Sequence, residues 1–217
     1  MKAVLGIDEA GRGAVLGPLV VAGVLVPGEG LDTLVELGAR DSKAVPRERR
    51  KELLAGIAQA AWVKAVVIPA RVVDQENLTQ LELSAAAKIV EEASPVTRHP
   101  SPITVVMDAP VAPGAIPAFR ARLASATGLP EGAISAYPKA DSLHPAVSAA
   151  SLAAKVIRDA YVAYLHTRYG DFGWGYPGEG KVVAFLTRWL AERGGLPPIC
   201  RTRWRTVKRL LDRSPVA

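Results

Sequence analysis

Short apolar segments rich in valine and isoleucine most constrain the fold of this chain. Each is bounded by glycine, proline or charged residues and is too short for a buried helix, so we predict β-strands. Four are clear and the last is weaker: Ala3–Ile7, Leu19–Val26, Trp62–Ile68, Ile103–Met107 and Ala133–Tyr137.

Helical periodicity covers much of the remaining chain, and several of these segments open with Pro or with Ser, Thr or Asp. They are Pro46–Gln59, Leu78–Ala93, Ala115–Ala126, Ala146–Tyr169, Lys181–Arg193 and Thr202–Leu211. Because three early strands come nearly in succession and the later strands alternate with helices, we predict a mixed α/β sheet. Strands 1–3 should be antiparallel and the others parallel. The chain shows no repeat or long linker, so we expect one domain over 1–217, of which roughly 179–217 is a basic helical C-terminal extension.

Positive charge is concentrated near the C-terminal end. The 217-residue chain has a net charge of +6 and a pI near 9.6. Residues 181–213 hold nine Lys or Arg against Glu192 and Asp212, a local net charge of +7. Such a segment favours a polyanionic partner, because each neutralised phosphate releases condensed counterions. A solvated helix face would explain the charge equally well.

The sequence predicts a cytoplasmic protein. Cys200 is the single cysteine and cannot form an internal disulfide. Asp8, Glu9 and Arg12 fall where a signal peptide would need an apolar core. The apolar segment 19–26 is far short of the roughly 20 residues that cross a bilayer. We therefore expect no membrane span, and a monomer is the default.

Four acidic residues stand out because of their positions. Asp8 and Glu9 directly follow one apolar strand, Asp108 ends another, and Asp141 precedes the alanine-rich helix at 146–169. Carboxylates in apolar strands face a large desolvation cost unless they are paired, solvated or bound to a cation. Taken singly, Asp8 could cap a turn, Asp108 could begin a loop, and Asp141 could be a first-turn acid of the long helix. Taken together, the acids favour a metal site.

The donor set indicates which metal to expect. Carboxylates without a His or Cys cluster suit Mg²⁺ or Mn²⁺ rather than zinc. The three histidines, His99, His144 and His166, show no zinc spacing, and we place His166 on a helix surface.

Two glycines flank an arginine directly after the acidic pair, in Gly11-Arg12-Gly13. Glycines let backbone amides approach a ligand closely, while arginine supplies a fork of donors. The alternative is a tight turn with Arg12 in solvent. The spacing fits neither a Walker loop nor a dinucleotide-binding fingerprint.

The order of these motifs resembles the signature blocks of the ribonuclease HII family. The matching blocks are Gly6–Gly13 with Gly17-Pro18, Asp41-Ser42-Lys43, Met107-Asp108-Ala109 and Lys139–Asp159. Gly173–Pro177 and Trp204-Arg205-Thr206 are similar to the archaeal and eukaryotic branch, so the resemblance runs from residue 6 to about 211. The sequence departs from that branch at Trp174, where a small residue is more usual, and at Gly178-Glu179-Gly180.

The resemblance implies a ribonuclease H-like fold and a catalytic centre of Asp8, Glu9, Asp108 and Asp141 that holds Mg²⁺ or Mn²⁺, two ions during catalysis. It also implies that Gly11, Arg12, Gly13 and Tyr176 recognise the sugar at an RNA-to-DNA junction. Further substrate-binding positions would be Lys43, Asn77 and Thr206, although Asn77 could equally be a helix N-cap before Leu78.

The implied activity is that of an endonuclease that cuts the RNA strand of RNA/DNA hybrids. It would also nick 5′ of ribonucleotides embedded in duplex DNA, leaving 3′-hydroxyl and 5′-phosphate ends. Two alternatives are a transposase or junction-resolving nuclease of the same broad fold, and a non-catalytic hybrid-binding protein. We read Ser148 and Ser151 as core residues, and Lys139, Lys155 and Arg158 as partners in structural salt bridges as readily as site residues.

Overall fold

The structure is a computed structural model that describes residues 3–39, 45–96 and 103–213. Its strands are β1 (Ala3–Ala10), β2 (Leu19–Pro27), β3 (Trp62–Ile68), β4 (Ile103–Asp108) and β5 (Ile134–Tyr137). Its α-helices are α1 (Gly30–Glu36), α2 (Arg47–Ala60), α3 (Ala70–Gln75), α4 (Leu78–Ala93), α5 (Ile116–Thr127), α6 (Ala140–Leu143), α7 (Pro145–Tyr169), α8 (Gly180–Arg193) and α9 (Arg205–Arg213).

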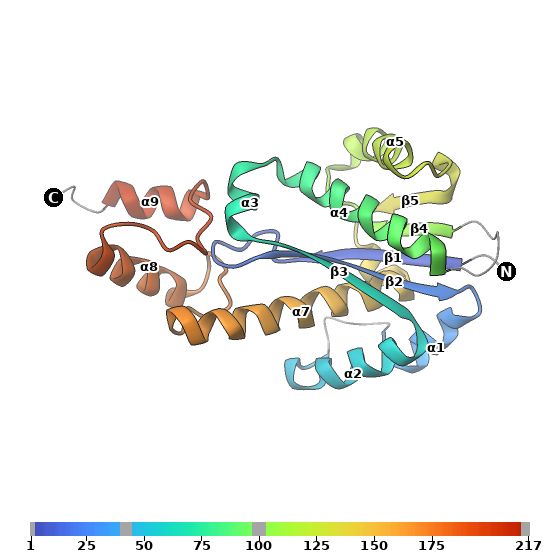
Figure 1. The fold of residues 1–217 in the computed structure, drawn as a ribbon, viewed down its shortest axis with the longest axis horizontal. Coiled ribbons are helices and arrows are strands. Elements are labelled where there is room, and N and C mark those ends of the chain that lie inside the picture. The colour runs from blue at the N-terminus through green and yellow to red at the C-terminus, as the bar shows by residue number, and fades with distance from the viewer. Residues whose placement is uncertain (1–2, 40–44, 97–102, 214–217) are drawn as a thin grey trace. The chain divides into compact units, whose positions relative to one another are not determined.

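The five strands form one mixed sheet in the order β3-β2-β1-β4-β5. β1 pairs with β4 in parallel, with Ile7 opposite Met107, and β4 pairs with β5 in parallel, with Asp108 opposite Tyr137. Figure 1 shows β2 running against both of its neighbours, β1 and β3. The prediction of antiparallel strands 1–3 followed by parallel strands is confirmed.

The described chain forms two compact units. The first comprises residues 3–10, 21–39, 45–66, 79–96 and 103–156, and the second comprises residues 11–20, 67–78 and 157–213. The single domain expected from the sequence stays a prediction, and each unit has its own internal packing.

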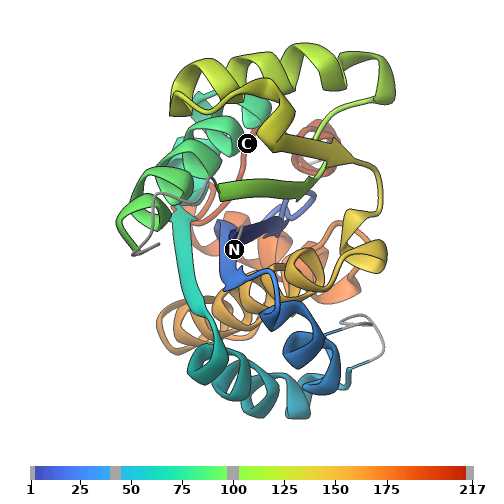
Figure 2. The same ribbon diagram turned by 90° about the vertical axis from the view of Figure 1, so that its right-hand side faces the viewer.

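Helices cover both faces of the sheet in the first unit, as Figure 2 shows for α7 and α2 on one side and α4 and α5 on the other. On the α7 side, buried Val24 and Val26 of β2 pack with Leu34, Ile57 and the small residues of α7. On the opposite side, Ile89 of α4 packs so closely on β2 that a Cβ at Gly23 would lie 2.4 Å from its side chain. This enclosure explains why β2 is a continuous apolar segment.

The second unit has a core of its own. Phe172, Phe185 and Val207 are buried there, together with Val15 and Leu16 from the amino-terminal part of the chain. The rings of Phe172 and Phe185 lie 5.4 Å apart between centroids. This core anchors α8 and α9, the helical extension expected at the C-terminal end.

The predicted long elements are all present, with shifts of a few residues at their ends. α4 spans the predicted 78–93, while α9 begins at Arg205 instead of Thr202. The Thr202 hydroxyl donates to the Asp74 carboxylate at 2.6 Å, so this residue is held outside the helix. The short helices α1, α3 and α6 were not predicted. Within the described residues, no helix is long and apolar enough to span a membrane.

Candidate active site

Three of the four predicted acids lie near one another at one edge of the sheet in the first unit, with Asp108 and Asp141 within electrostatic range of Asp8. Ile7 and Met107 are register partners on parallel strands, so the next residues, Asp8 and Asp108, lie side by side near the carboxyl ends of β1 and β4. β5 ends at Tyr137, opposite Asp108, and leads directly to α6, which contains Asp141. The Asp108 carboxylate accepts a hydrogen bond from the Ala140 amide at 2.9 Å, which ties the start of α6 to the end of β4.

A backbone turn places Asp141 at this edge. Lys139 has φ 61°, the only non-glycine residue with positive φ in the described chain. This left-handed conformation costs on the order of 1–2 kcal/mol per residue. Asp141 then lies in the first turn of the four-residue helix α6, and not in the first turn of the long helix α7 as one of our alternatives held.

Asp8 is the acid of this group that both other aspartates influence electrostatically. Its side chain is 6% exposed. The pKa of Asp8 is raised from 3.8 to about 6. Burial is the largest cause, hydrogen bonds from the Ser151 hydroxyl and the Glu9 amide act against it, and the carboxylates of Asp108 and Asp141 add to the rise. The Glu9 amide donates to Asp8 at 2.8 Å. Asp8 is therefore close enough to Asp108 and to Asp141 for each of them to repel its negative charge.

The donor set fits a hard divalent cation, because it consists of carboxylate oxygens at a buried strand edge. A bound cation would lower the pKa of Asp8, which burial and, to a smaller extent, the neighbouring carboxylates raise. The structure describes the side chains of residues 3–39, 45–96 and 103–212. Among these, no three His, Cys, Asp or Glu side chains lie close enough together to hold a metal ion. Glu9 is the fourth carboxylate and follows Asp8 on β1, where it is partly exposed.

The predicted Gly-Arg-Gly motif lies in the second unit, on the loop 11–18. Gly11 is buried with φ 87°, and a Cβ there would lie 2.3 Å from the Arg158 side chain, so this position requires glycine. Gly13 is exposed, and nothing lies within 4 Å of the position that a Cβ would occupy. The loop thus presents an open backbone at Gly13.

Arg201 holds this loop from one side. Its side chain is fully buried, and its guanidinium donates to the Arg12 carbonyl at 3.0 Å and to the Gly17 carbonyl at 3.1 Å. The Arg201 amide donates to the Val15 carbonyl at 2.8 Å. Hydrogen bonds from a charged donor contribute about 1.5–3 kcal/mol each, so Arg201 is a principal determinant of the loop conformation.

Arg158 joins the same loop to the segment that contains Tyr176. Its side chain is 2% exposed. Its guanidinium donates to the carbonyls of Leu16 and Pro18, each at 3.3 Å, and to the Trp174 carbonyl at 2.9 Å. The Arg158 Cζ atom lies over the Tyr176 ring, 4.8 Å from its centroid. Tyr176 is 38% exposed, so its ring rests on a buried cation while part of it remains open to a ligand.

The remaining predicted substrate-binding residues are spread over the chain. Thr206 lies in α9 and lines a pocket of about 240 Å³ with Pro177, Val183 and Arg209. Asn77 directly precedes α4, the N-cap position of our alternative interpretation. Lys43 lies outside the described residues.

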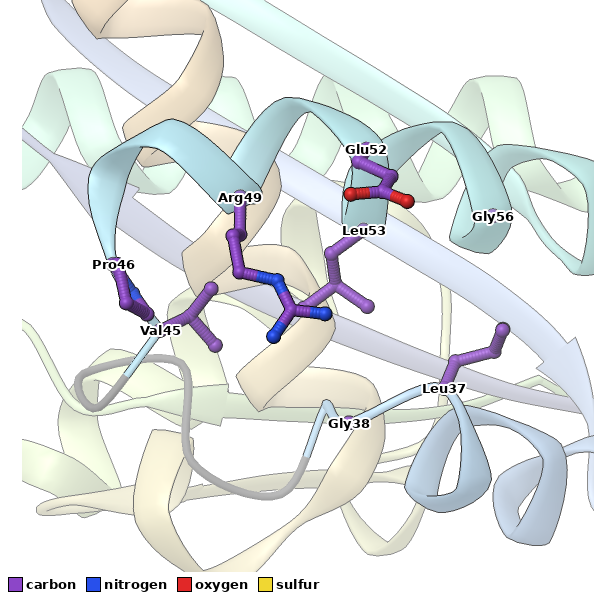
Figure 3. A pocket seen from close by; sticks show the side chains of 8 residues that line it. All are labelled: Leu37, Gly38, Val45, Pro46, Arg49, Glu52, Leu53 and Gly56. Atoms are coloured by element: carbon purple, nitrogen blue, oxygen red, sulfur yellow. The ribbon is translucent and has the colours of Figure 1, made fainter.

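Figure 3 shows a pocket of about 560 Å³ in the first unit, between α2 and the end of α1. Arg49 and Glu52 extend from α2 beside the apolar side chains of Leu37 and Leu53. Among the residues that the structure describes, its lining contains none of the predicted site residues, so we assign it no part in the site.

Sequence reasoning missed the structural parts of the second unit. Arg158 was considered for a structural salt bridge or for a place in the site, but not as a support of the loop, and Arg201 was not considered. His166 was predicted on a helix surface and is partly exposed on α7, but its contacts were not foreseen: its Nε2 atom lies 2.8 Å from the Gly173 carbonyl, and its ring packs edge-on against Phe172 with centroids 4.5 Å apart.

The mixed sheet, with acids at the carboxyl ends of its central parallel strands, is that of a ribonuclease H-like protein. A crystal structure of ribonuclease H2 from Pyrococcus horikoshii is similar, with a TM-score of 0.84, 28% identity, and coverage of 97% of this chain and 98% of that one. Ribonuclease HII from Archaeoglobus fulgidus, solved in complex with PCNA, has a TM-score of 0.81 and 33% identity over 93% and 95% of the two chains.

The sequence comparisons identify the family. The ribonuclease HII profile matches residues 5–207. Ribonuclease HII of Hyperthermus butylicus is 39% identical over 95% of this chain and 83% of its own length, and that of Thermofilum pendens is 37% identical over 97% and 100%. The chain belongs to the ribonuclease HII family.

Proposed function

We propose that this chain is a metal-dependent endonuclease that hydrolyses the RNA strand of RNA/DNA hybrids and nicks 5′ of ribonucleotides embedded in duplex DNA. The observation that carries the proposal is the meeting of Asp8, Asp108 and Asp141 at one sheet edge in a member of the ribonuclease HII family. Family membership favours this activity over that of a transposase or junction-resolving nuclease. Its setting would be removal of RNA during DNA replication and repair in the cytoplasm.

Asp8, Glu9, Asp108 and Asp141 would hold Mg²⁺ or Mn²⁺. Two such ions supply an activated water and stabilise the leaving oxygen in phosphodiester hydrolysis. The protein fixes the carboxylates through short local contacts: the Ala140 amide holds Asp108, and the Glu9 amide and Ser151 hydroxyl hold Asp8. Hydrolysis leaves 3′-hydroxyl and 5′-phosphate ends.

Recognition of RNA requires contact with the 2′-hydroxyl, the group that distinguishes it from DNA at a given sugar. We assign this contact to the backbone of Gly11, Arg12 and Gly13, and packing on the adjacent deoxyribose to Tyr176. The exposed backbone at Gly13 and the partly open Tyr176 ring support this assignment. Lys43, Asn77 and Thr206 would contact phosphates.

The deciding experiment compares three duplexes labelled on one strand: all-DNA, RNA/DNA hybrid, and DNA with a single ribonucleotide. We expect cleavage of the last two with Mg²⁺ or Mn²⁺, none with EDTA, and a nick on the 5′ side of the ribonucleotide. Cleavage of the all-DNA duplex would favour the junction-resolving alternative. Binding of the hybrid without cleavage under any of these metals would favour a non-catalytic protein.

A further inference from the structure

The loop that carries Tyr176 is held by a dense set of hydrogen bonds within the second unit. The Asp171 carboxylate accepts from the Gly173 amide at 2.8 Å, and His166 hydrogen-bonds the Gly173 carbonyl. The Gly175 carbonyl accepts from the amides of Val15 and Leu16 at 2.7 and 3.2 Å. The backbone around Tyr176 is therefore tied to the predicted junction-reading loop 11–18.

Glu179 makes the contacts closest to Tyr176. Its two carboxylate oxygens accept from the Trp174 amide at 2.7 Å and from the Tyr176 amide at 3.0 Å. The Glu179 amide donates to the Tyr176 carbonyl at 3.1 Å, which closes the turn. The Glu179 side chain thus holds the backbone on both sides of Gly175, at Trp174 and at Tyr176.

Glu179 stands at a position where a side chain usually binds its own helix. Glu179 is the N-cap residue of α8, and its side chain makes no capping hydrogen bond with that helix. N-cap side chains commonly satisfy the first amides of their own helix. Here both oxygens are directed to the preceding loop instead, so the carboxylate orders the loop and not the helix.

Gly173 and Trp174 fit the same arrangement. A Cβ at Gly173, which has φ 74°, would lie 2.4 Å from the Glu179 carboxylate, so the absence of a side chain allows the close approach. Trp174 packs against the buried cluster that includes Phe172. The loop is consequently anchored by an apolar side chain on one side and by Glu179 on the other.

We propose that Glu179 is a positioning residue for Tyr176 and thereby sets the selectivity of the enzyme for a ribonucleotide followed by deoxyribose. The carboxylate fixes the backbone of residues 174–176, and Arg158 supports the ring. A ring fixed before the substrate arrives loses less conformational entropy on binding. The proposal rests on the proposed function, because it concerns the sugar contact assigned there to Tyr176.

The test uses the full-length chain with Glu179→Ala, Tyr176→Ala and the double variant. We expect Glu179→Ala to lower kcat/KM on the single-ribonucleotide duplex more than on a uniform hybrid, each measured with Mn²⁺. The ratio should fall by roughly 5- to 150-fold, the range for removal of an aromatic ring that stacks on a nucleic acid. In the Tyr176→Ala background, Glu179→Ala should change the ratio little further. Additive effects in this cycle would overturn the proposal.

A second measurement does not depend on activity. Amide hydrogen exchange measured by NMR should show reduced protection at Trp174 and Tyr176 in Glu179→Ala. Glu179→Gln keeps the side-chain volume but only one acceptor oxygen, so it should lose protection at one of the two amides and show an intermediate ratio. Unchanged protection at both amides in both variants would refute the positioning role.

The control is Glu192→Gln, the same chemical change at an exposed residue of α8, which should leave both the ratio and the amide protection unchanged. If Tyr176→Ala itself leaves the ratio unchanged, the sugar contact assigned to Tyr176 is refuted, and with it the effect of Glu179 on selectivity. If Tyr176→Ala changes the ratio and Glu179→Ala does not, only the positioning proposal fails.

Discussion

Replacement of Asp8 by asparagine should stabilise the metal-free protein at neutral pH while abolishing its activity. Asp8 is buried beside Asp108 and Asp141, and its pKa is raised from 3.8 to about 6. The folded protein therefore holds this proton more tightly than the unfolded chain does. The stability that the folded protein gains from holding this proton is fully present below about pH 4. It is lost as the pH rises to about 6, and above that pH the free energy of unfolding no longer changes with the ionisation of Asp8.

The magnitude follows from the two pKa values. A rise from 3.8 to about 6 corresponds to about 3 kcal/mol of stability lost at neutral pH. Asparagine carries no charge and still offers an oxygen to the Glu9 amide, so most of this loss should be recovered. For a protein of 150–250 residues, each kcal/mol changes Tm by about 2–4 °C. We expect the Asp8→Asn protein to melt up to about 10 °C higher at pH 7.

The assay is thermal unfolding in EDTA, followed by circular dichroism, at pH 4, 5, 6, 7 and 8. The difference in Tm between Asp8→Asn and wild type should be near zero at pH 4 and should grow to a plateau above pH 6. Asp32→Asn, at an exposed position of α1, is the matched control and should show no such trend. Addition of Mn²⁺ at pH 7 should raise the Tm of the wild type and narrow the gap. A Tm difference that does not vary with pH would refute the electrostatic reasoning.

Three further predictions concern other residues. We expect kcat to fall by at least about 100-fold, with the fold intact, in each of the variants Glu9→Gln, Asp108→Asn and Asp141→Asn, because each substitution removes a charge from the proposed metal centre. Near-normal turnover of the Asp108 variant would contradict that centre. Conversion of Arg205, Lys208 and Arg209 to glutamine should weaken binding to hybrid and to plain duplex alike. The plot of log affinity against log salt concentration should become less steep by roughly 0.9 for each phosphate that is no longer neutralised. An unchanged slope would mean that α9 is a solvated face. Cys200, whose pKa is raised to about 12 by burial and by Asp74, should resist a thiol reagent at pH 8 in the native protein and react after denaturation, and rapid labelling of the native protein would contradict its buried position.

The elements that could be predicted are those with a strong local signal. The buried strand β2 is a continuous apolar segment, and α4 shows a clear helical period, so both were placed within a residue or two. α6 is only four residues long and depends on the left-handed Lys139 and on the Asp108 carboxylate, which comes from another strand. No periodicity can develop over so short a segment.

The same distinction applies to the site. The acids could be proposed because a carboxylate at the end of an apolar strand is unusual in itself. The contributions of Arg158, Arg201 and Glu179 depend on carbonyls and amides of the backbone, which have no sequence signature of their own. Their roles become visible only when the loops 11–18 and 173–176 are brought together in the fold.

The buried position of Arg201 also has a consequence for the timing of folding. The chain is synthesised from its amino terminus at about 5–20 residues per second, and Arg12 and Arg201 are 189 residues apart in sequence. The Gly-Arg-Gly loop thus emerges roughly 10–40 seconds before the side chain that binds its carbonyls. A nascent chain that ends before Arg201 already contains all four acids and every strand of the sheet, yet it lacks the guanidinium that shapes the loop.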